Sequence, residues 1–143
     1  MSLDELFQRA ASVIRRYFPE EAHAAVEHGA VLVDIRSSDA RRRDGVIPGA
    51  VHVPRTVLEW RTEPDGEWRN PLLDGRRLIL VCDHGYSSVL AAATLVGLGR
   101  DCGDVVGGFE GWAAIGLPIA AAGADPAGLP GMGGPDPQPS ENK

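Results

Sequence analysis

A short apolar strand that ends directly on a cysteine is the feature that most constrains how this chain can fold. Residues 78–81 (LILV) form a continuous apolar run, which is the pattern of a strand covered on both faces of a parallel sheet. The run stops at Cys82, and after a turn Ser87 and Ser88 precede an Ala/Leu/Val-rich stretch. That stretch predicts a helix with a hydroxyl cap at its start. Cys82 is therefore expected at the carboxyl edge of a parallel sheet, where the sites of open α/β proteins gather.

The turn that follows the strand is suited to holding an anion. Cys82 to Ser87 form a six-residue turn, and its amide N–H groups can converge just ahead of the helix N-terminus. Gly85 is the residue of this turn that takes positive φ at little steric cost. Such a nest lowers the pKa of a thiol, whereas the neighbouring carboxylate of Asp83 raises it. We therefore expect a partly lowered pKa and a nucleophilic Cys82 near neutral pH.

The rest of the chain alternates between strands and helices, which indicates an α/β fold with a mainly parallel sheet. Residues 2–5 spell a capping box (S-x-x-E) ahead of an amphipathic helix that is predicted to run to residue 18. The other elements are predicted as strands at residues 30–36, 50–53 and 104–106 and helices at residues 20–28, 39–43, 56–60 and 109–115. The expected organisation is an N-terminal helix (residues 1–18), one domain (residues 19–120) and a Pro/Gly-rich disordered tail (residues 121–143).

Composition is that of a soluble globular protein. The 143 residues are 43% hydrophobic and 24% charged, which suits a single domain with its own core. A net charge of −6 gives no general affinity for nucleic acid or anionic membranes, and no apolar stretch approaches the ~20 residues that span a bilayer. The two cysteines do not make a disulfide framework, and the first residues lack the pattern of a signal peptide. A reducing, cytoplasmic location is expected.

Four motifs occur in an order that resembles a known family: VDIR (33–36), GVIPGAVHVP (45–54), CDHGYSS (82–88), and GGFEGW (107–112) with GLPI (116–119). Together they resemble the landmarks of the rhodanese-like sulfurtransferases from about Pro19 to Ile119. The resemblance implies a central, mainly parallel five-stranded sheet flanked by helices on both faces, and sulfur transfer through a cysteine persulfide without a metal or organic cofactor. It implies Cys82 as the nucleophile, and as the loop that wraps it Asp83, His84, Gly85, Tyr86, Ser87 and Ser88.

Other polar side chains are expected near the same edge of the sheet. Asp34 and Arg36 are interpreted as a structural ion pair or loop brace, with substrate contact as the alternative. Arg55, just past the VHVP strand, is the cation expected to face the pocket. His84 either assists as a cation or is an exposed loop residue. Many members of the resembled family carry Arg or Lys inside the loop, whereas this loop has Asp83, so the donor could be thiosulfate or a persulfide.

Competing functions require residues that this loop lacks. A phosphatase needs an arginine that binds phosphate with two hydrogen bonds, but the sixth residue after Cys82 is Ser88. Arsenate reduction also prefers a cationic loop. Dithiol chemistry would need Cys102, which is predicted at the opposite edge of the sheet, beyond the ~7 Å limit for a disulfide. The four histidines and two cysteines show no metal-ligand spacing, so no metal is expected.

One alternative stays open from the sequence. The chain could be a non-catalytic or carrier module of the same fold that binds a partner protein. For the enzyme, the expected partners are a small sulfur donor and an acceptor that is cyanide, a thiol or another protein.

Overall fold

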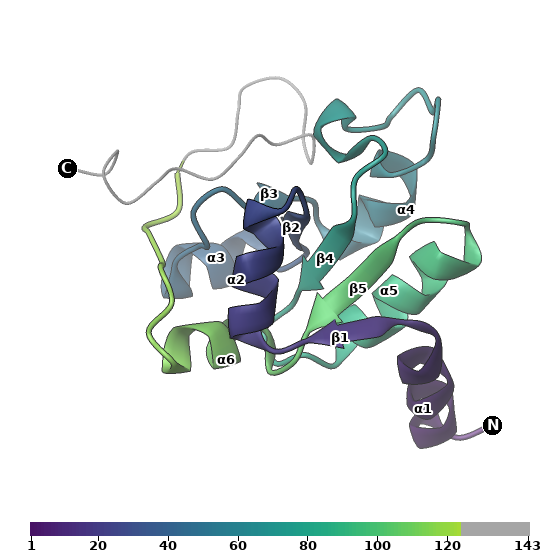
Figure 1. The fold of residues 1–143 in the computed structure, drawn as a ribbon, viewed down its shortest axis with the longest axis horizontal. Coiled ribbons are helices and arrows are strands. Elements are labelled where there is room, and N and C mark those ends of the chain that lie inside the picture. Colours follow the sequence, from purple (N-terminus) through teal and green to yellow (C-terminus); the bar gives the residue numbers. More distant parts are fainter. Residues whose placement is uncertain (124–143) are drawn as a thin grey trace.

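One parallel sheet organises the computed structural model, which describes residues 1–123. The strand order is β1-β5-β4-β2-β3, and every neighbouring pair is parallel (Figure 1). The strands are β1 (Arg15–Tyr17), β2 (Val31–Asp34), β3 (Val51–His52), β4 (Leu78–Val81) and β5 (Cys102–Val105). The predicted α/β class and five-stranded, mainly parallel sheet are confirmed. Of the predicted tail, residues 124–143 lie outside the described part of the chain.

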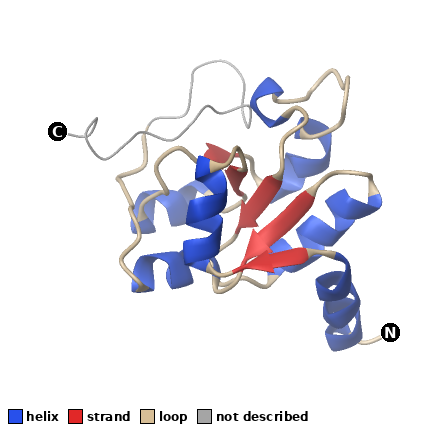
Figure 2. Cartoon of the chain, in the orientation of Figure 1, coloured by secondary structure: helices blue, strands red, loops and turns tan. Residues whose placement is uncertain are grey.

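Helices cover both faces of the sheet (Figure 2). They are α1 (Leu3–Val13), α2 (Pro19–Glu27), α3 (Ser38–Asp44), α4 (Leu58–Arg61), α5 (Ser87–Gly97) and α6 (Gly108–Ala114), with short 3₁₀ turns η1 (Arg55–Val57) and η2 (Pro71–Leu73). Side chains of α4 and α5 pack in one apolar cluster, and side chains of α2 and α6 pack in a second. α1 lies against α5. Within residues 1–123, no helix is long and apolar enough to cross a membrane.

β4 contributes to both clusters, which explains its uninterrupted apolar sequence. Leu78, Leu80 and Cys82 belong to the cluster on the α5 side, whereas Ile79 and Val81 belong to the other. This alternation is the period of two that a strand imposes. Because both faces are covered, a polar side chain at any of these positions would lose its water. The alternation also directs the Cys82 side chain toward α5.

The N-terminal helix is shorter than predicted. It ends at Val13, and Arg15–Tyr17 form the edge strand β1, which pairs with β5, so the helix predicted through Phe18 is wrong beyond Val13. Tyr17 keeps the apolar position that the helical pattern gave it, because it is buried in the second cluster. The backbone of these residues instead joins the sheet, where tertiary pairing outweighs a weak local preference.

Candidate active site

Cys82 lies at the carboxyl end of β4, where the loop to α5 begins, and is 5% exposed. The Gly85 amide donates to its Sγ at 3.1 Å, and its thiol donates to Ser88 Oγ at 3.2 Å. Burial raises the pKa of the thiol, but the hydroxyls of Ser88 and Ser87 and the amides of Ser88 and Gly85 together outweigh burial. The pKa of Cys82 is therefore lowered, which makes it a nucleophile nearer neutral pH.

The cysteine loop packs closely against the start of α6 at two glycines, Gly85 and Gly108. Gly85 has φ +83°, the left-handed conformation predicted for it, and a Cβ there would lie 2.6 Å from the amide nitrogen of Gly107. A Cβ on Gly108 would lie 2.4 Å from the carbonyl oxygen of Cys82. The amide of Phe109 donates to that same carbonyl at 2.8 Å, and the amide of Glu110 donates to the carbonyl of Asp83 at 3.1 Å. The start of α6 thus binds the carbonyls of Cys82 and Asp83, while the amide of Gly85 faces the sulfur.

Ser88 connects Cys82 to a partly buried ion pair. Its hydroxyl donates to Asp104 Oδ2 at 2.7 Å, and both Ser88 and Asp104 are 0% exposed. Arg16 of β1 binds both carboxylate oxygens of Asp104, Nε to Oδ1 at 2.9 Å and Nη2 to Oδ2 at 3.1 Å. Arg16 Nη2 also donates to the carbonyl of Gly85 at 2.8 Å. The two strands at this edge of the sheet therefore hold both the loop and the first turn of α5.

The predicted hydroxyl cap of α5 is wrong. The N-cap residue is Tyr86, which makes no side-chain cap hydrogen bond, and Ser87 is the first helical residue. The hydroxyl of Ser88 is directed toward Cys82 and Asp104 instead. Tyr86 is exposed, and its ring centroid lies 6.1 Å from that of Phe7 in α1.

A pocket lies beside the loop, lined by Arg43, Asp44, Asp83, His84, Phe109, Glu110 and Ala113. His84 is exposed, and its Nδ1 lies 2.5 Å from Glu110 Oε2. The cation that lines this pocket is Arg43, which pairs with Asp44 at 2.9 Å. The guanidinium of Arg55 pairs with Glu59 at 2.8 Å, and Arg55 does not line this pocket. A contact between Arg55 and a substrate stays a prediction.

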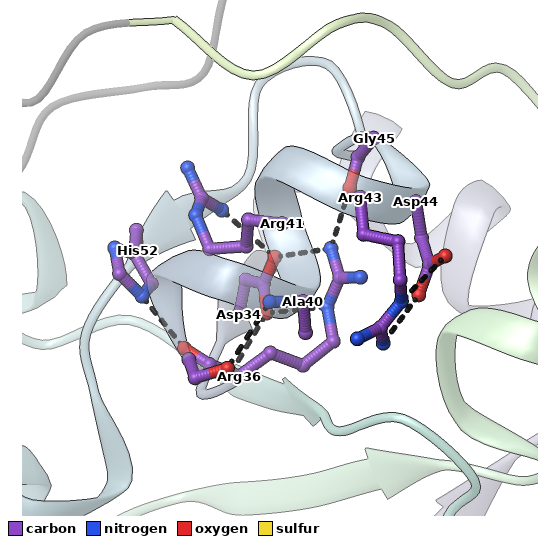
Figure 3. A network of polar contacts seen from close by, with 9 residues as sticks. Asp34, Arg36, Ala40, Arg41, Arg43, Asp44, Gly45 and His52 are labelled. Carbon is purple, nitrogen blue, oxygen red and sulfur yellow. Dashed lines mark hydrogen bonds and ion pairs between the residues drawn. The ribbon is translucent and has the colours of Figure 1, made fainter.

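Asp34 and Arg36 form the centre of a buried network under the same edge of the sheet (Figure 3). Arg36 donates to Asp34 Oδ1 at 3.1 Å and to Oδ2 at 2.9 Å, and Arg41 donates to Oδ2 at 2.8 Å. Burial raises the pKa of Asp34, but Arg36 and Arg41 outweigh it and lower that pKa. Arg36 also donates to the carbonyl of Gly45 and stacks 3.9 Å above the ring of Phe109. This geometry supports the loop-brace interpretation, and substrate contact stays a prediction.

Cys102 lies at the far end of the neighbouring strand. It pairs with Leu78, four residues before Cys82, so the strand rise of ~3.3 Å separates the two cysteines by about 13 Å. Both cysteines are free. Burial raises the pKa of Cys102 to about 12. The predicted separation is confirmed. Residues 1–123 contain no group of three or more His, Cys, Asp or Glu side chains that could hold a metal ion.

Sequence reasoning missed three residues that build the site: Arg16, Asp104 and Gly108. Asp104 had a usable signal, since an acidic residue inside a buried strand requires a partner. Gly108 was named only as part of the GGFEGW motif. Arg16 had no signal, because it lay in a segment interpreted as helix and its partner is 88 positions away.

The fold and the loop define an α/β domain with an anion-stabilising cysteine loop at the carboxyl edge of its sheet. A family model described as the rhodanese-like domain matches residues 18–115, and the chain belongs to this family. A thiosulfate sulfurtransferase GlpE from Pseudomonas syringae pv. syringae is 43% identical over 100 residues, which cover 68% of this chain and 86% of the relative. The enzyme of the same name from Actinobacillus pleuropneumoniae is 36% identical over 106 residues, covering 73% and 91%.

Solved structures share this fold. A protein of unknown function from Rhodopseudomonas palustris, described as a possible tyrosine phosphatase, has a TM-score of 0.77 at 29% identity and covers 83% of this chain and 94% of its own. The polysulfide-sulfur transferase homodimer from Wolinella succinogenes has a TM-score of 0.65 at 22% identity, with coverage of 80% and 84%. The second similarity concerns the fold alone.

Proposed function

We propose that this chain is a sulfurtransferase that moves sulfane sulfur from thiosulfate or a persulfide to cyanide, a thiol or a protein acceptor through a persulfide on Cys82. The observation that carries the proposal is the buried Sγ of Cys82, which accepts the Gly85 amide at 3.1 Å within a loop that lowers the pKa of the thiol. The relatives named thiosulfate sulfurtransferase, at about 40% identity, support the same activity.

The first half-reaction loads the cysteine. The Cys82 thiolate attacks the outer sulfur of thiosulfate, so that an Sγ–S bond forms while the S–S bond of the donor breaks and sulfite leaves with the bonding electron pair. The negative charge then resides on the terminal sulfur of the persulfide, where loop amides stabilise it. Charge and electrons balance in this step without a metal or an organic cofactor.

The second half-reaction unloads the cysteine. An acceptor such as cyanide attacks the terminal sulfur, thiocyanate leaves, and the Cys82 thiolate is regenerated. Because donor and acceptor react in turn with the same sulfur, the kinetics are ping-pong. Asp34, Arg36 and His84 have supporting positions in this proposal, as braces or neighbours of the loop, and Arg43 is the cation available to an anionic donor in the pocket beside it.

The loop does not favour phosphatase chemistry, although one structural neighbour is described as a possible tyrosine phosphatase. Phosphate recognition depends on a guanidinium that makes paired hydrogen bonds. Here the position six residues after Cys82 is Ser88, which is buried and bonded to Asp104. The one arginine that reaches the loop, among the hydrogen bonds of residues 1–123, is Arg16, and it binds a loop carbonyl.

Thiocyanate formation from thiosulfate and cyanide tests the proposal. We expect wild-type protein and Cys102→Ser to turn over with parallel-line kinetics, because Cys102 is inert and distant. Cys82→Ser should lose turnover while unfolding like wild type, since one thiol-to-hydroxyl change barely alters burial. Retention of most turnover in Cys82→Ser contradicts the proposed mechanism. We place the protein in a reducing, cytoplasmic setting, in keeping with two free cysteines.

A further inference from the structure

The hydroxyl of Ser88 lies between two groups that compete for its single proton. In the structure it donates to Asp104 Oδ2 at 2.7 Å and accepts the thiol of Cys82 at 3.2 Å. Once Cys82 is a thiolate, its sulfur has no proton to give and needs donors instead. Ser88 cannot donate to the carboxylate and to the thiolate at once. Its hydroxyl must therefore rotate toward the sulfur, or the thiolate loses a donor.

The ion pair with Arg16 lowers the energetic cost of that rotation. Asp104 is completely buried, and a buried carboxylate that lost its hydrogen bonds would be strongly destabilised. Arg16 reaches both carboxylate oxygens, at 2.9 and 3.1 Å, so Asp104 stays neutralised and hydrogen-bonded when Ser88 turns away. Without Arg16, the full negative charge of Asp104 would hold the Ser88 proton and repel a thiolate one hydroxyl away.

We propose that Ser88 is a catalytic residue whose hydroxyl switches from Asp104 to the Cys82 sulfur when the thiolate forms, and that Arg16 is the positioning residue that releases it. The thiol proton leaves to solvent, and no other bond changes. The catalytic role of Ser88 rests on the proposed sulfur transfer. Arg16 precedes residues 18–115, the part matched by the family model, so the segment before that domain takes part in the site.

Other charged and titratable groups surround the switch and limit how it is tested. Arg16 comes from β1, Cys102 lies two residues before Asp104 on β5, and the loop and α6 add Asp83, His84 and Glu110. Of these groups, only Arg16 and Cys102 are altered in the variants below. Cys102 is replaced by serine throughout, so that Cys82 is the single thiol that reports.

The test measures the rate of Cys82 alkylation by iodoacetamide against pH, which gives the midpoint of thiolate formation. We expect Ser88→Ala to raise the midpoint by about one to two pH units, because the thiolate loses a hydrogen bond to a charged group. If Ser88 stayed fixed on Asp104, it would only accept from the thiol, and its loss would lower the midpoint or leave it unchanged. That second result overturns the switch.

The role of Arg16 is tested by the pH midpoint of Cys82 alkylation in single and double variants, because structural damage to the loop would not be reversed by a second substitution. We expect Arg16→Gln to raise the midpoint and Asp104→Asn to lower it, because they remove opposite charges. The double variant Arg16→Gln/Asp104→Asn should return toward the wild-type midpoint, since no anion then holds the Ser88 proton. If Asp104→Asn fails to reverse the effect of Arg16→Gln, Arg16 acts only by bonding the Gly85 carbonyl, and its positioning role is overturned.

An exposed Arg–Asp ion pair distant from the loop provides the control. Arg77 and Asp101 pair at 2.8 Å near the start of β5, away from the loop. Arg77→Gln and Asp101→Asn should leave the Cys82 midpoint at its wild-type value. Should Asp104→Asn not fold, Ser88→Ala still decides the switch by the sign of its shift. Alkylation requires no sulfur donor, so failure of the switch is distinguished from failure of sulfur transfer, which the turnover of the wild type reports.

Discussion

The buried carboxylate of Asp34 balances two buried guanidinium groups, and its replacement by asparagine tests how far the scaffold beneath the loop depends on charge. Arg36 is 3% exposed and Arg41 is 5% exposed. Their nitrogens lie 2.8 to 3.1 Å from the carboxylate oxygens of Asp34. Asparagine keeps one acceptor oxygen and removes the charge, so Asp34→Asn takes away the carboxylate that binds Arg36 and Arg41.

The expected loss follows from that burial. Removing one partner of a buried ion pair costs about 3–5 kcal/mol, and we expect a loss in the free energy of unfolding within that range. For a domain of this size, the melting temperature Tm should fall by about 10 to 20 °C. The loss is expected in the free energy of unfolding, while the Cys82 loop retains its own contacts with α6 and Arg16.

Urea unfolding followed by tryptophan fluorescence measures this loss, because Trp112 is buried in the core. Asp39→Asn is the matched control, since Asp39 pairs with Arg42 on an exposed helix surface and its replacement should change stability little.

The stabilisation by Asp34 should also depend on pH. The folded-state pKa of Asp34 is lowered, so its contribution to the free energy of unfolding is complete above the unfolded pKa of ~3.9 and is lost as pH falls through the folded pKa. The gap between wild type and Asp34→Asn should therefore shrink below about pH 4. A variant as stable as Asp39→Asn at neutral pH refutes the reasoning.

Two further predictions concern the loop and the thiols. Gly108→Ala should displace the loop and lower both stability and sulfur transfer, because its Cβ would lie 2.4 Å from the Cys82 carbonyl oxygen. Gly75 has a similar positive φ, but no atom lies within 4 Å of a Cβ built on it. Gly75→Ala should therefore cost only backbone strain of about 1–3 kcal/mol and leave sulfur transfer intact. Equal transfer in the two variants would contradict the close approach. In folded protein at neutral pH, iodoacetamide should label Cys82 once and leave Cys102, whose pKa is about 12, unlabelled until unfolding, as peptide mapping can check.

The parts of the fold that follow from local pattern were predictable. The run at residues 78–81 has the pattern of a buried strand, and the positive φ of Gly85 follows from the turn that the cysteine loop requires. Both depend on residues that are neighbours in sequence. The site residues supplied by other strands were not predictable in the same way, because pairing between β1 and β5 is decided by tertiary contact rather than by the three residues of β1.

Arg55 and Ser88 show where side-chain direction limits sequence reasoning. Both occur in expected elements, but their partners depend on the way each side chain points. Arg55 meets Glu59 one turn later, an i,i+4 pair that competes with any role in a pocket. Ser88 faces inward because β5 offers Asp104 beneath the first turn of α5, so a serine expected to cap a helix bonds to the cysteine and the carboxylate instead.

Intact-protein mass spectrometry after incubation with thiosulfate, and separately with a low-molecular-weight persulfide, tests the central claim most directly. The account predicts a gain of one sulfur in wild type and in Cys102→Ser, absent in Cys82→Ser, and lost when cyanide or a thiol is added. The donor that produces the gain identifies the substrate class. A wild type that gains no sulfur from either donor would contradict the enzyme and favour a carrier module that receives sulfur from, or binds, a partner protein.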